Sequence, residues 1–146
     1  MADRVPPTVR LLVPCEEAQQ DQDTDQLLIL NPLALVGLPP DLTFPIEVEE
    51  LSVYAQVTHG IGVFPLSVEV RQVYDGNEED RVVHQSEPLT LTFPTAARLE
   101  IYHLVFQLKN VPFDEPGIYE FRLLSDAEEF ESPVATLRVL DQRAPL

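Results

Sequence analysis

Apolar and polar residues alternate along most of this chain, and the alternation limits what it can fold into. In segment 51–58, Leu51, Val53, Ala55 and Val57 fall on one face, with mostly polar residues between them. A period of two residues indicates a β-strand with one buried face, because successive side chains point to opposite sides of a strand. No sustained helical period accompanies it. We therefore expect a chain of β-strands.

The same alternation recurs in segments that are separated by turn residues. Residues 64–86 are predicted to form a hairpin, with the Asp75-Gly76 turn signal between its strands. Segment 99–111 is apolar on both faces, which predicts a central strand. Further strands are predicted at 8–14, 26–30, 119–124 and 135–140, and the segment 88–93 also alternates.

About eight strands follow from this pattern, and 14 prolines against 5 glycines favour short strands with rigid connections. We predict an all-β fold, an antiparallel two-sheet sandwich of immunoglobulin-like character. Residues 1–146 are expected to form one domain, because the length suits a single core and no linker is evident. The acidic stretch 16–26 is predicted to be a flexible loop between the first two strands.

Tyr119 and Phe121 are predicted to have a structural role in a late strand. Tyr119 stands two residues before an inward-facing apolar residue, as in the tyrosine corner of immunoglobulin-type sandwiches, with Phe121 in the place of the usual cysteine. A tyrosine there can bury its ring while its hydroxyl bonds to nearby backbone, which would fix a crossing between sheets. The alternative is a core tyrosine without that bond.

The formal charge of −16 makes nucleic acids and membrane surfaces improbable partners, because both carry negative charge. Cys15 is the single cysteine, so no disulfide can form within the chain, which suits a reducing compartment. The N-terminal residues lack the pattern of a signal peptide, and the longest apolar run is too short to span a bilayer. A cytoplasmic protein is expected.

Two long segments carry a resemblance to a known family. They are LSVYAQVTHGIGVFPLSVEV (51–70) and LKNVPFDEPGIYEFRLL (108–124). With the order of the segments around them, they resemble an uncharacterised bacterial family of small β-sandwich proteins, classed as a domain of unknown function. The resemblance implies a β-sandwich over nearly the whole chain and supplies no activity, ligand or catalytic residue.

Residues that could bind metal are present without the spacing of a metal site. His59, His84 and His103 form no recognised ligand motif. Asp21, Asp23 and Asp25 stand at the alternate positions with which a calcium loop begins, and are weak candidates only. Gln26 occupies the glycine position of such a loop, and Pro32 stands in place of its bidentate glutamate. No metal and no cofactor are expected.

Catalytic and sugar-binding motifs are also missing from the sequence. Cys15 is followed by two glutamates, whose charge would raise the thiol pKa and suppress the nucleophilic thiolate. No nucleophile-elbow serine or glycine-rich phosphate loop occurs. The chain contains no Trp, which argues against an aromatic platform for carbohydrate.

Four residues are candidates for a protein interface. Ile101, His103 and Val105 share one face of the expected central strand, and Leu124 is a candidate to join them. If no loop covers them, they form an apolar patch suited to homodimerisation. The alternative is that the same residues close the core.

These observations favour a non-catalytic, cytoplasmic binding or structural module that acts through protein–protein contacts, and not an enzyme. The alternative is a metal-dependent enzyme or a calcium-dependent module that uses scattered Asp, Glu and His residues. Convergence of two histidines with a carboxylate would favour the alternative.

Overall fold

The computed structural model describes separate stretches of the chain, and the regular secondary structure within them consists of β-strands. These stretches are residues 4–20, 27–32, 35–38, 45–73, 80–94, 100–126 and 130–141. Their strands are β1 (Thr8–Gln20), β2 (Leu27–Pro32), β3 (Leu35–Leu38), β4 (Ile46–Thr58), β5 (Gly62–Val73), β6 (Arg81–Gln85), β7 (Leu89–Phe93), β8 (Tyr102–Phe113), β9 (Gly117–Ser125) and β10 (Ala135–Asp141).

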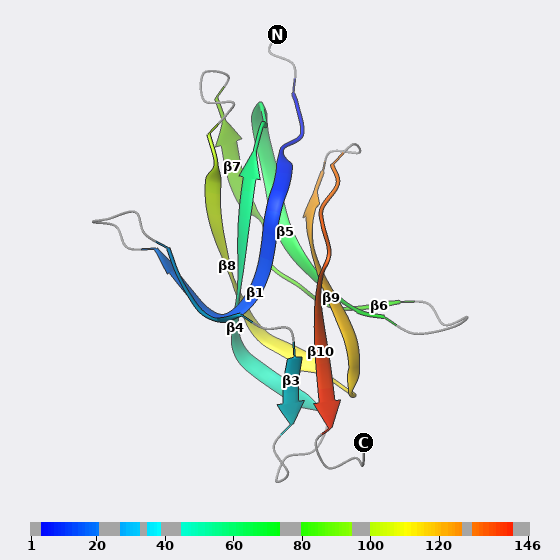
Figure 1. Ribbon diagram of the computed structural model, residues 1–146. Coiled ribbons are helices and arrows are strands. Elements are labelled where there is room, and N and C mark those ends of the chain that lie inside the picture. The colour runs from blue at the N-terminus through cyan, green and yellow to red at the C-terminus, as the bar shows by residue number, and fades with distance from the viewer. Residues whose placement is uncertain are drawn as a thin grey trace.

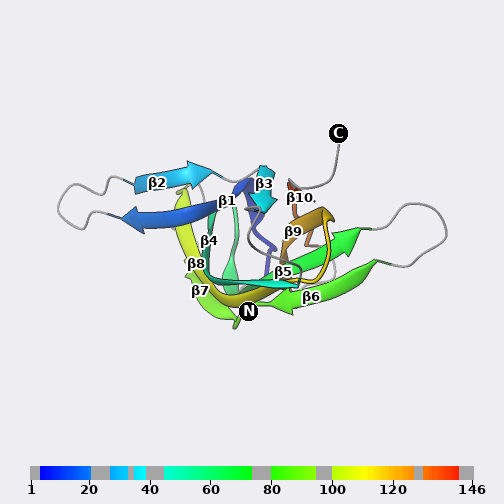
Figure 2. The same cartoon turned by 90° about the horizontal axis from the view of Figure 1, so that it is seen from below.

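The strands form two sheets that pack face to face (Figures 1 and 2). One sheet has four strands in the order β2-β1-β4-β8. The other has six strands, with the order β3-β10-β9-β5-β6 and with β7 also paired to β5. All strand pairs are antiparallel except β3 with β10. The predicted all-β sandwich is confirmed, with ten strands in the described residues where about eight were expected.

The core lies between the two sheets and is built from alternate residues of their strands. Strand β4 contributes Val53 and Val57 to the core, and β5 contributes Leu66 and Val68. Burying each such side chain contributes about 1.5–3 kcal/mol to stability. Further core residues come from β8, β9 and β10, namely Leu104, Phe106, Leu108, Tyr119, Phe121, Leu123, Leu137 and Val139. The alternation of apolar residues in the sequence therefore predicts correctly which side chains of these strands face the core.

The expectation that segment 99–111 forms a central strand is wrong. Strand β8 takes the last place in its sheet and pairs with β4 alone among the described strands. Leu104 and Phe106 face the core, whereas Val105 packs against Tyr54 on the opposite, outer face of the sheet. An apolar pattern on both faces does not distinguish a strand between two neighbours from an edge strand whose outer residues form a second small cluster.

Strand β1 continues past its pairing with β4 into a hairpin arm with β2. Residues 8–15 pair with β4 and residues 15–20 pair with β2, so that Cys15 has a partner on both sides. The predicted acidic loop at 16–26 is therefore wrong as far as Gln20, because backbone pairing with β2 holds this polar segment extended. The rest of that loop lies outside the described residues. This arm and the β5–β6 hairpin extend from opposite sides of the body (Figures 1 and 2).

Tyr119 makes the corner hydrogen bond that the sequence predicted. Its ring is fully buried, and its hydroxyl donates to the carbonyl oxygen of Glu115 at 2.7 Å. The ring meets Phe113 edge-on, with centroids 4.8 Å apart and planes at 86°. Because Phe113 ends β8 and Tyr119 belongs to β9, this contact fixes the crossing from one sheet to the other. Phe121 lies in the core beside it, as expected.

Replacing Tyr119 with Phe should lower the free energy of unfolding by about 1 kcal/mol, because the hydrogen bond to the Glu115 carbonyl is lost while the ring remains. Urea unfolding followed by circular dichroism measures this loss. Tyr102→Phe is the control, since that hydroxyl has no hydrogen bond within the described residues, and it should change stability by less than about 0.5 kcal/mol. Equal losses in the two variants would contradict the structural role of the corner.

Candidate functional site

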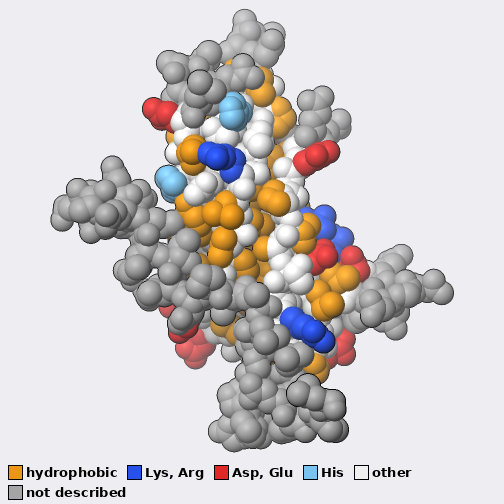
Figure 3. All heavy atoms as spheres, viewed as in Figure 1, with side chains coloured by type: hydrophobic (Ala, Val, Ile, Leu, Met, Phe, Trp, Pro, Cys, Tyr) orange, Lys and Arg blue, Asp and Glu red, His pale blue; other side chains and the backbone are white. Residues whose placement is uncertain are grey.

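The outer face of the four-stranded sheet carries no charged side chain over nine neighbouring positions. Strand register places these residues in three rows across β1, β4 and β8. The rows are Leu11, Gln56 and His103; Val13, Tyr54 and Val105; and Cys15, Ser52 and Gln107. These residues are termed the uncharged face. In a chain with 25 Asp and Glu, such a surface is a local exception. Figure 3 shows hydrophobic side chains in the middle of the view, with His and a Lys or Arg side chain above them and most acidic side chains toward the outline.

Tyr54 is the centre of the uncharged face. Only 2% of it is exposed, and it packs in a small cluster with Cys15, Ala18 and the half-buried Val105. Its ring stacks on His103 with centroids 5.9 Å apart, and its hydroxyl oxygen lies 2.5 Å from His103 Nδ1.

A second hydrogen bond orients the Tyr54 hydroxyl. It accepts from Gln56 Nε2 at 2.8 Å, which leaves its own proton to donate. Tyr54 therefore links Gln56 and His103 in one chain of hydrogen bonds. One row further along the same face, the Ser52 hydroxyl donates to Gln107 Oε1 at 3.0 Å. These side-chain pairs hold the surface in one arrangement.

The structure brings together some of the predicted interface residues and separates one. His103 and Val105 lie on the uncharged face, and Ile101 precedes β8 with 41% of its surface exposed. Leu124 belongs to β9 in the other sheet, opposite Ser67. Because Leu123 points into the core, Leu124 faces outward from the six-stranded sheet and does not join the other three.

The candidate metal ligands are not gathered into a site in the described residues. His59 lies in the turn after β4, whereas His84 and His103 lie on strands of different sheets. Among the described residues, no three His, Cys, Asp or Glu side chains stand close enough to hold a metal ion. Asp21, Asp23 and Asp25 lie outside the described residues. The histidine convergence that would favour a metal enzyme is not observed in this part of the chain.

Cys15 is a free and fully buried cysteine in the Tyr54 cluster. Burial raises the pKa of its thiol, because an apolar environment disfavours the charged thiolate. The sequence also predicted a raised thiol pKa, but from the charge of neighbouring carboxylates, whereas in the structure desolvation is the cause. The residue therefore has the properties of a packing cysteine rather than those of a nucleophile.

The outer face of the six-stranded sheet has the opposite character, and the sequence did not predict it. Glu69 and Arg71 on β5 stand across from Arg122 and Glu120 on β9, so that opposite charges alternate in both directions. Glu69 is only 7% exposed and lies 2.9 Å from Arg71 and 4.0 Å from Arg122. Opposite charges two residues apart occur in both strands, and they could have indicated this face. The pattern can be interpreted only when the pairing of the two strands is known.

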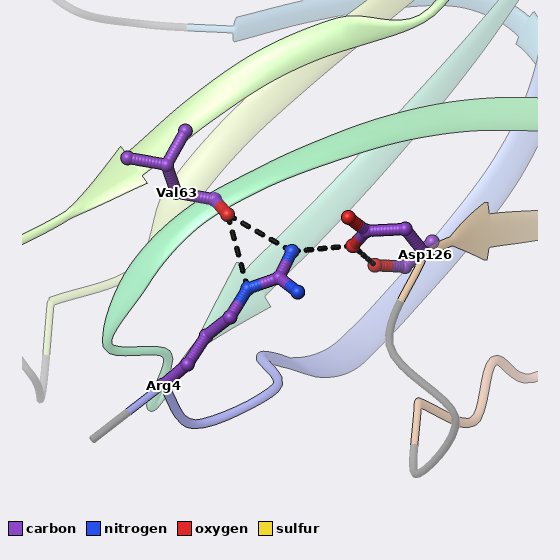
Figure 4. Close-up of polar contacts among 4 residues, drawn as sticks. Arg4, Val63 and Asp126 are labelled. Carbon is purple, nitrogen blue, oxygen red and sulfur yellow. Dashed lines mark hydrogen bonds and ion pairs between the residues drawn. The ribbon is translucent and has the colours of Figure 1, made fainter.

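Arg4 attaches the N-terminal segment to the body and was also missed. Its guanidinium lies 4.2 Å from the centre of the Phe64 ring, donates to the Val63 carbonyl at 3.0 and 3.2 Å, and pairs with Asp126 (Figure 4). A backbone bridge between Val5 and Ile61 continues the attachment. A lone arginine near a chain end gives no sequence signal for such contacts.

A hollow of about 550 Å³ lies between β8 and the connection from β6 to β7. Its lining comprises His84, Gln85, Ser86, Glu87, Pro88, Leu89, Val105, Phe106, Gln107 and Lys109. Burial lowers the pKa of His84 on this wall, because desolvation disfavours the charged imidazolium. No pattern in the sequence indicates the hollow, since its two walls come from different sheets.

His84→Gln should reduce the loss of stability on acidification. The lowered pKa means that the unfolded chain binds the proton more tightly, so His84 destabilises the fold as pH falls below the ordinary histidine pKa of about 6.5. Urea unfolding at pH 7.5 and pH 5.5 should therefore show a smaller difference for the variant than for the wild type. Gln85→Asn, a neutral substitution in the same wall of the hollow, is the control and should lose as much stability on acidification as the wild type. A His84→Gln protein that acidification destabilises as much as the wild type would contradict this assignment.

Comparison with known proteins identifies the family. No helix in the described stretches has the length and hydropathy of a membrane span. Curated proteins gave no match. A solved structure of β-glucosidase from Listeria innocua, in complex with gluconolactone, is 13% identical to this chain, with a TM-score of 0.44. The match covers 92% of this chain and 16% of the β-glucosidase chain. At this level of similarity we draw no conclusion about fold or activity from it. The profile of a family of unknown function, DUF6941, matches residues 10–139. The chain therefore belongs to the DUF6941 family, in agreement with the resemblance to an uncharacterised domain.

Proposed function

We propose that this protein is a non-catalytic binding or structural module of the cytoplasm that acts through protein–protein contacts at the uncharged face. The observation that carries the proposal is the absence of charge from all nine residues of that face in a chain of formal charge −16. Cores of protein interfaces are depleted in charged residues and enriched in aromatic ones. Tyr54 at the centre is only 2% exposed and supports the face from beneath, so the surface open to a partner comes from exposed members such as Leu11 and His103.

The side chains of the uncharged face are already arranged for contact. Gln56 and His103 both bond to the Tyr54 hydroxyl, so covering them would leave few polar groups without a partner. Leu11 at its rim is 40% exposed and offers apolar area for burial. Little ordering of side chains is then required on binding, which favours affinity.

A second copy of the chain is the partner that is simplest to test. Two identical faces without charge can meet about a twofold axis without placing like charges opposite each other. The cytoplasmic location is supported by a single cysteine that is buried and free.

Light scattering of the purified protein should give the mass of a dimer that is unchanged by chelator. Leu11→Lys and Ile101→Lys should each weaken the dimer by about tenfold or more, because a charge is placed in or beside the contact. Ile118→Lys is the matched control, with the same exposed fraction of 41% as Ile101 but in the other sheet, and it should leave the mass unchanged.

A monomeric wild type at concentrations of about 100 μM would exclude a second copy as the partner at any affinity typical of stable dimers. A mass that falls on chelation would instead favour the metal-dependent alternative. Equal effects of Ile101→Lys and Ile118→Lys would contradict the uncharged face as the contact surface.

A further inference from the structure

Strand β8 leaves one of its two edges without a strand partner in the part of the chain that the structure describes. Its register with β4 runs from Tyr102 opposite Val57 to Phe113 opposite Ile46. No other described strand pairs with it. In an edge strand, alternate backbone N–H and C=O groups point away from the sheet and can pair with an added strand.

Only one half of this edge carries the features that natural proteins use against strand addition. In the C-terminal half, Lys109, Asn110 with a φ of +57° and Pro112 oppose pairing. Residues 102–108 contain no Lys, no Pro and no positive φ. The unprotected segment therefore has Val105 at its centre.

The hollow beside β8 keeps this segment uncovered by the other sheet. Val105, Phe106 and Gln107 all line it, although successive residues of a strand point to opposite faces. A space that contacts three consecutive residues lies beside the edge of the strand and not over one face. The acidic and basic side chains of its lining are one carboxylate, Glu87, and one ammonium, Lys109. The edge is therefore locally balanced in charge, in a chain of formal charge −16.

Antiparallel pairing of the segment with its own copy brings together side chains of the same kind. A twofold axis at Val105 places this residue opposite its copy, Leu104 opposite Phe106, and His103 opposite Gln107. Apolar residues thus meet apolar ones, and polar residues meet polar ones. Matched cross-strand pairs of this kind stabilise a sheet.

The charged residues next to the segment also favour a second copy as the partner. Glu100 is the nearest on the N-terminal side, and Lys109 is the nearest on the C-terminal side. Because antiparallel strands run in opposite directions, the Glu100 end of one copy lies beside the Lys109 end of the other. Opposite charges therefore meet at both ends of the paired segment, whereas parallel pairing in register would place like charges together.

We infer that residues 102–108 of β8 pair antiparallel with the same residues of a second copy of this chain, about a twofold axis at Val105. The inference rests on the proposed function in taking a second copy as the partner, and it adds a contact through the backbone edge of β8. This axis is perpendicular to the sheet, whereas the axis of a face-to-face dimer lies in the plane of the face, so both contacts can act together in a tetramer. A short strand pair buries less area than a standard interface, so we expect the edge contact only at high protein concentration.

Amide hydrogen exchange by NMR tests the contact in the wild type and in Leu11→Lys. Raising the protein concentration from about 20 μM to about 500 μM should slow exchange at alternate residues within 102–108 by at least about fivefold, since those N–H groups gain acceptors. Leu11→Lys should show the same slowing, because β1 is separated from β8 by β4. The amides of β2, at the other edge of the same sheet, should not change. Unchanged exchange within 102–108 would overturn the inference.

Disulfide trapping in the Leu11→Lys background tests the register. Val105→Cys should form a covalent dimer on mild oxidation, because directly opposite residues of an antiparallel pair have Cα atoms roughly 4.5–5.5 Å apart, which suits a disulfide. Lys109→Cys, on the same face of β8, is the matched control. Its copy would lie about 27 Å away, so it should form at least about tenfold less covalent dimer. Equal yields from the two variants would overturn the inference.

These outcomes are separable from that of the proposed function. A dimer that Leu11→Lys breaks, with unchanged exchange within 102–108 and no disulfide at Val105→Cys, would overturn this inference alone. Slower exchange and the Val105→Cys disulfide, in a protein whose mass Leu11→Lys leaves unchanged, would support this inference and contradict the uncharged face as the contact surface.

Discussion

Burial of alternate side chains between the two sheets is the interaction on which the remaining features depend. Val53 and Val57 from one sheet, and Leu66 and Val68 from the other, are completely removed from solvent in the same cluster. A shift of one residue in any of these strands would turn its apolar set outward, so the register is strongly determined. Once the inner faces are fixed, the identity of every residue on the outer faces follows.

The polar side chains on the outer faces of the two sheets find their partners in different ways. On the four-stranded sheet, neutral groups bond to each other around Tyr54 and His103. On the six-stranded sheet, Glu69 is nearly buried among Arg71 and Arg122. A buried ion pair has to offset the cost of desolvating its charges, and removing one partner is strongly destabilising. The neutral face carries no such cost, since its central residues Tyr54 and Ser52 are buried without a charge.

Much of the inner architecture could be predicted from the sequence, and the sheet assignments could not. Leu51 to Val57 were assigned to the correct face because a period of two residues is a local property. Tyr119 was recognisable because its partner, Glu115, is four residues away. Leu124 was grouped with His103 in error, since membership of a sheet depends on pairing between distant segments. The edge position of β8 and the hollow beside it were hidden for the same reason.

Strand β1 connects the uncharged face to the hairpin arm through one unbroken stretch of backbone. Cys15 is the residue at which it passes from pairing with β4 to pairing with β2, and its side chain is fully buried there. No turn or loop separates the two regions, so the arm has no joint at its base. A force applied to the arm would therefore be transmitted directly to the sheet. The packing of Tyr54 against Cys15 would resist rotation of the arm.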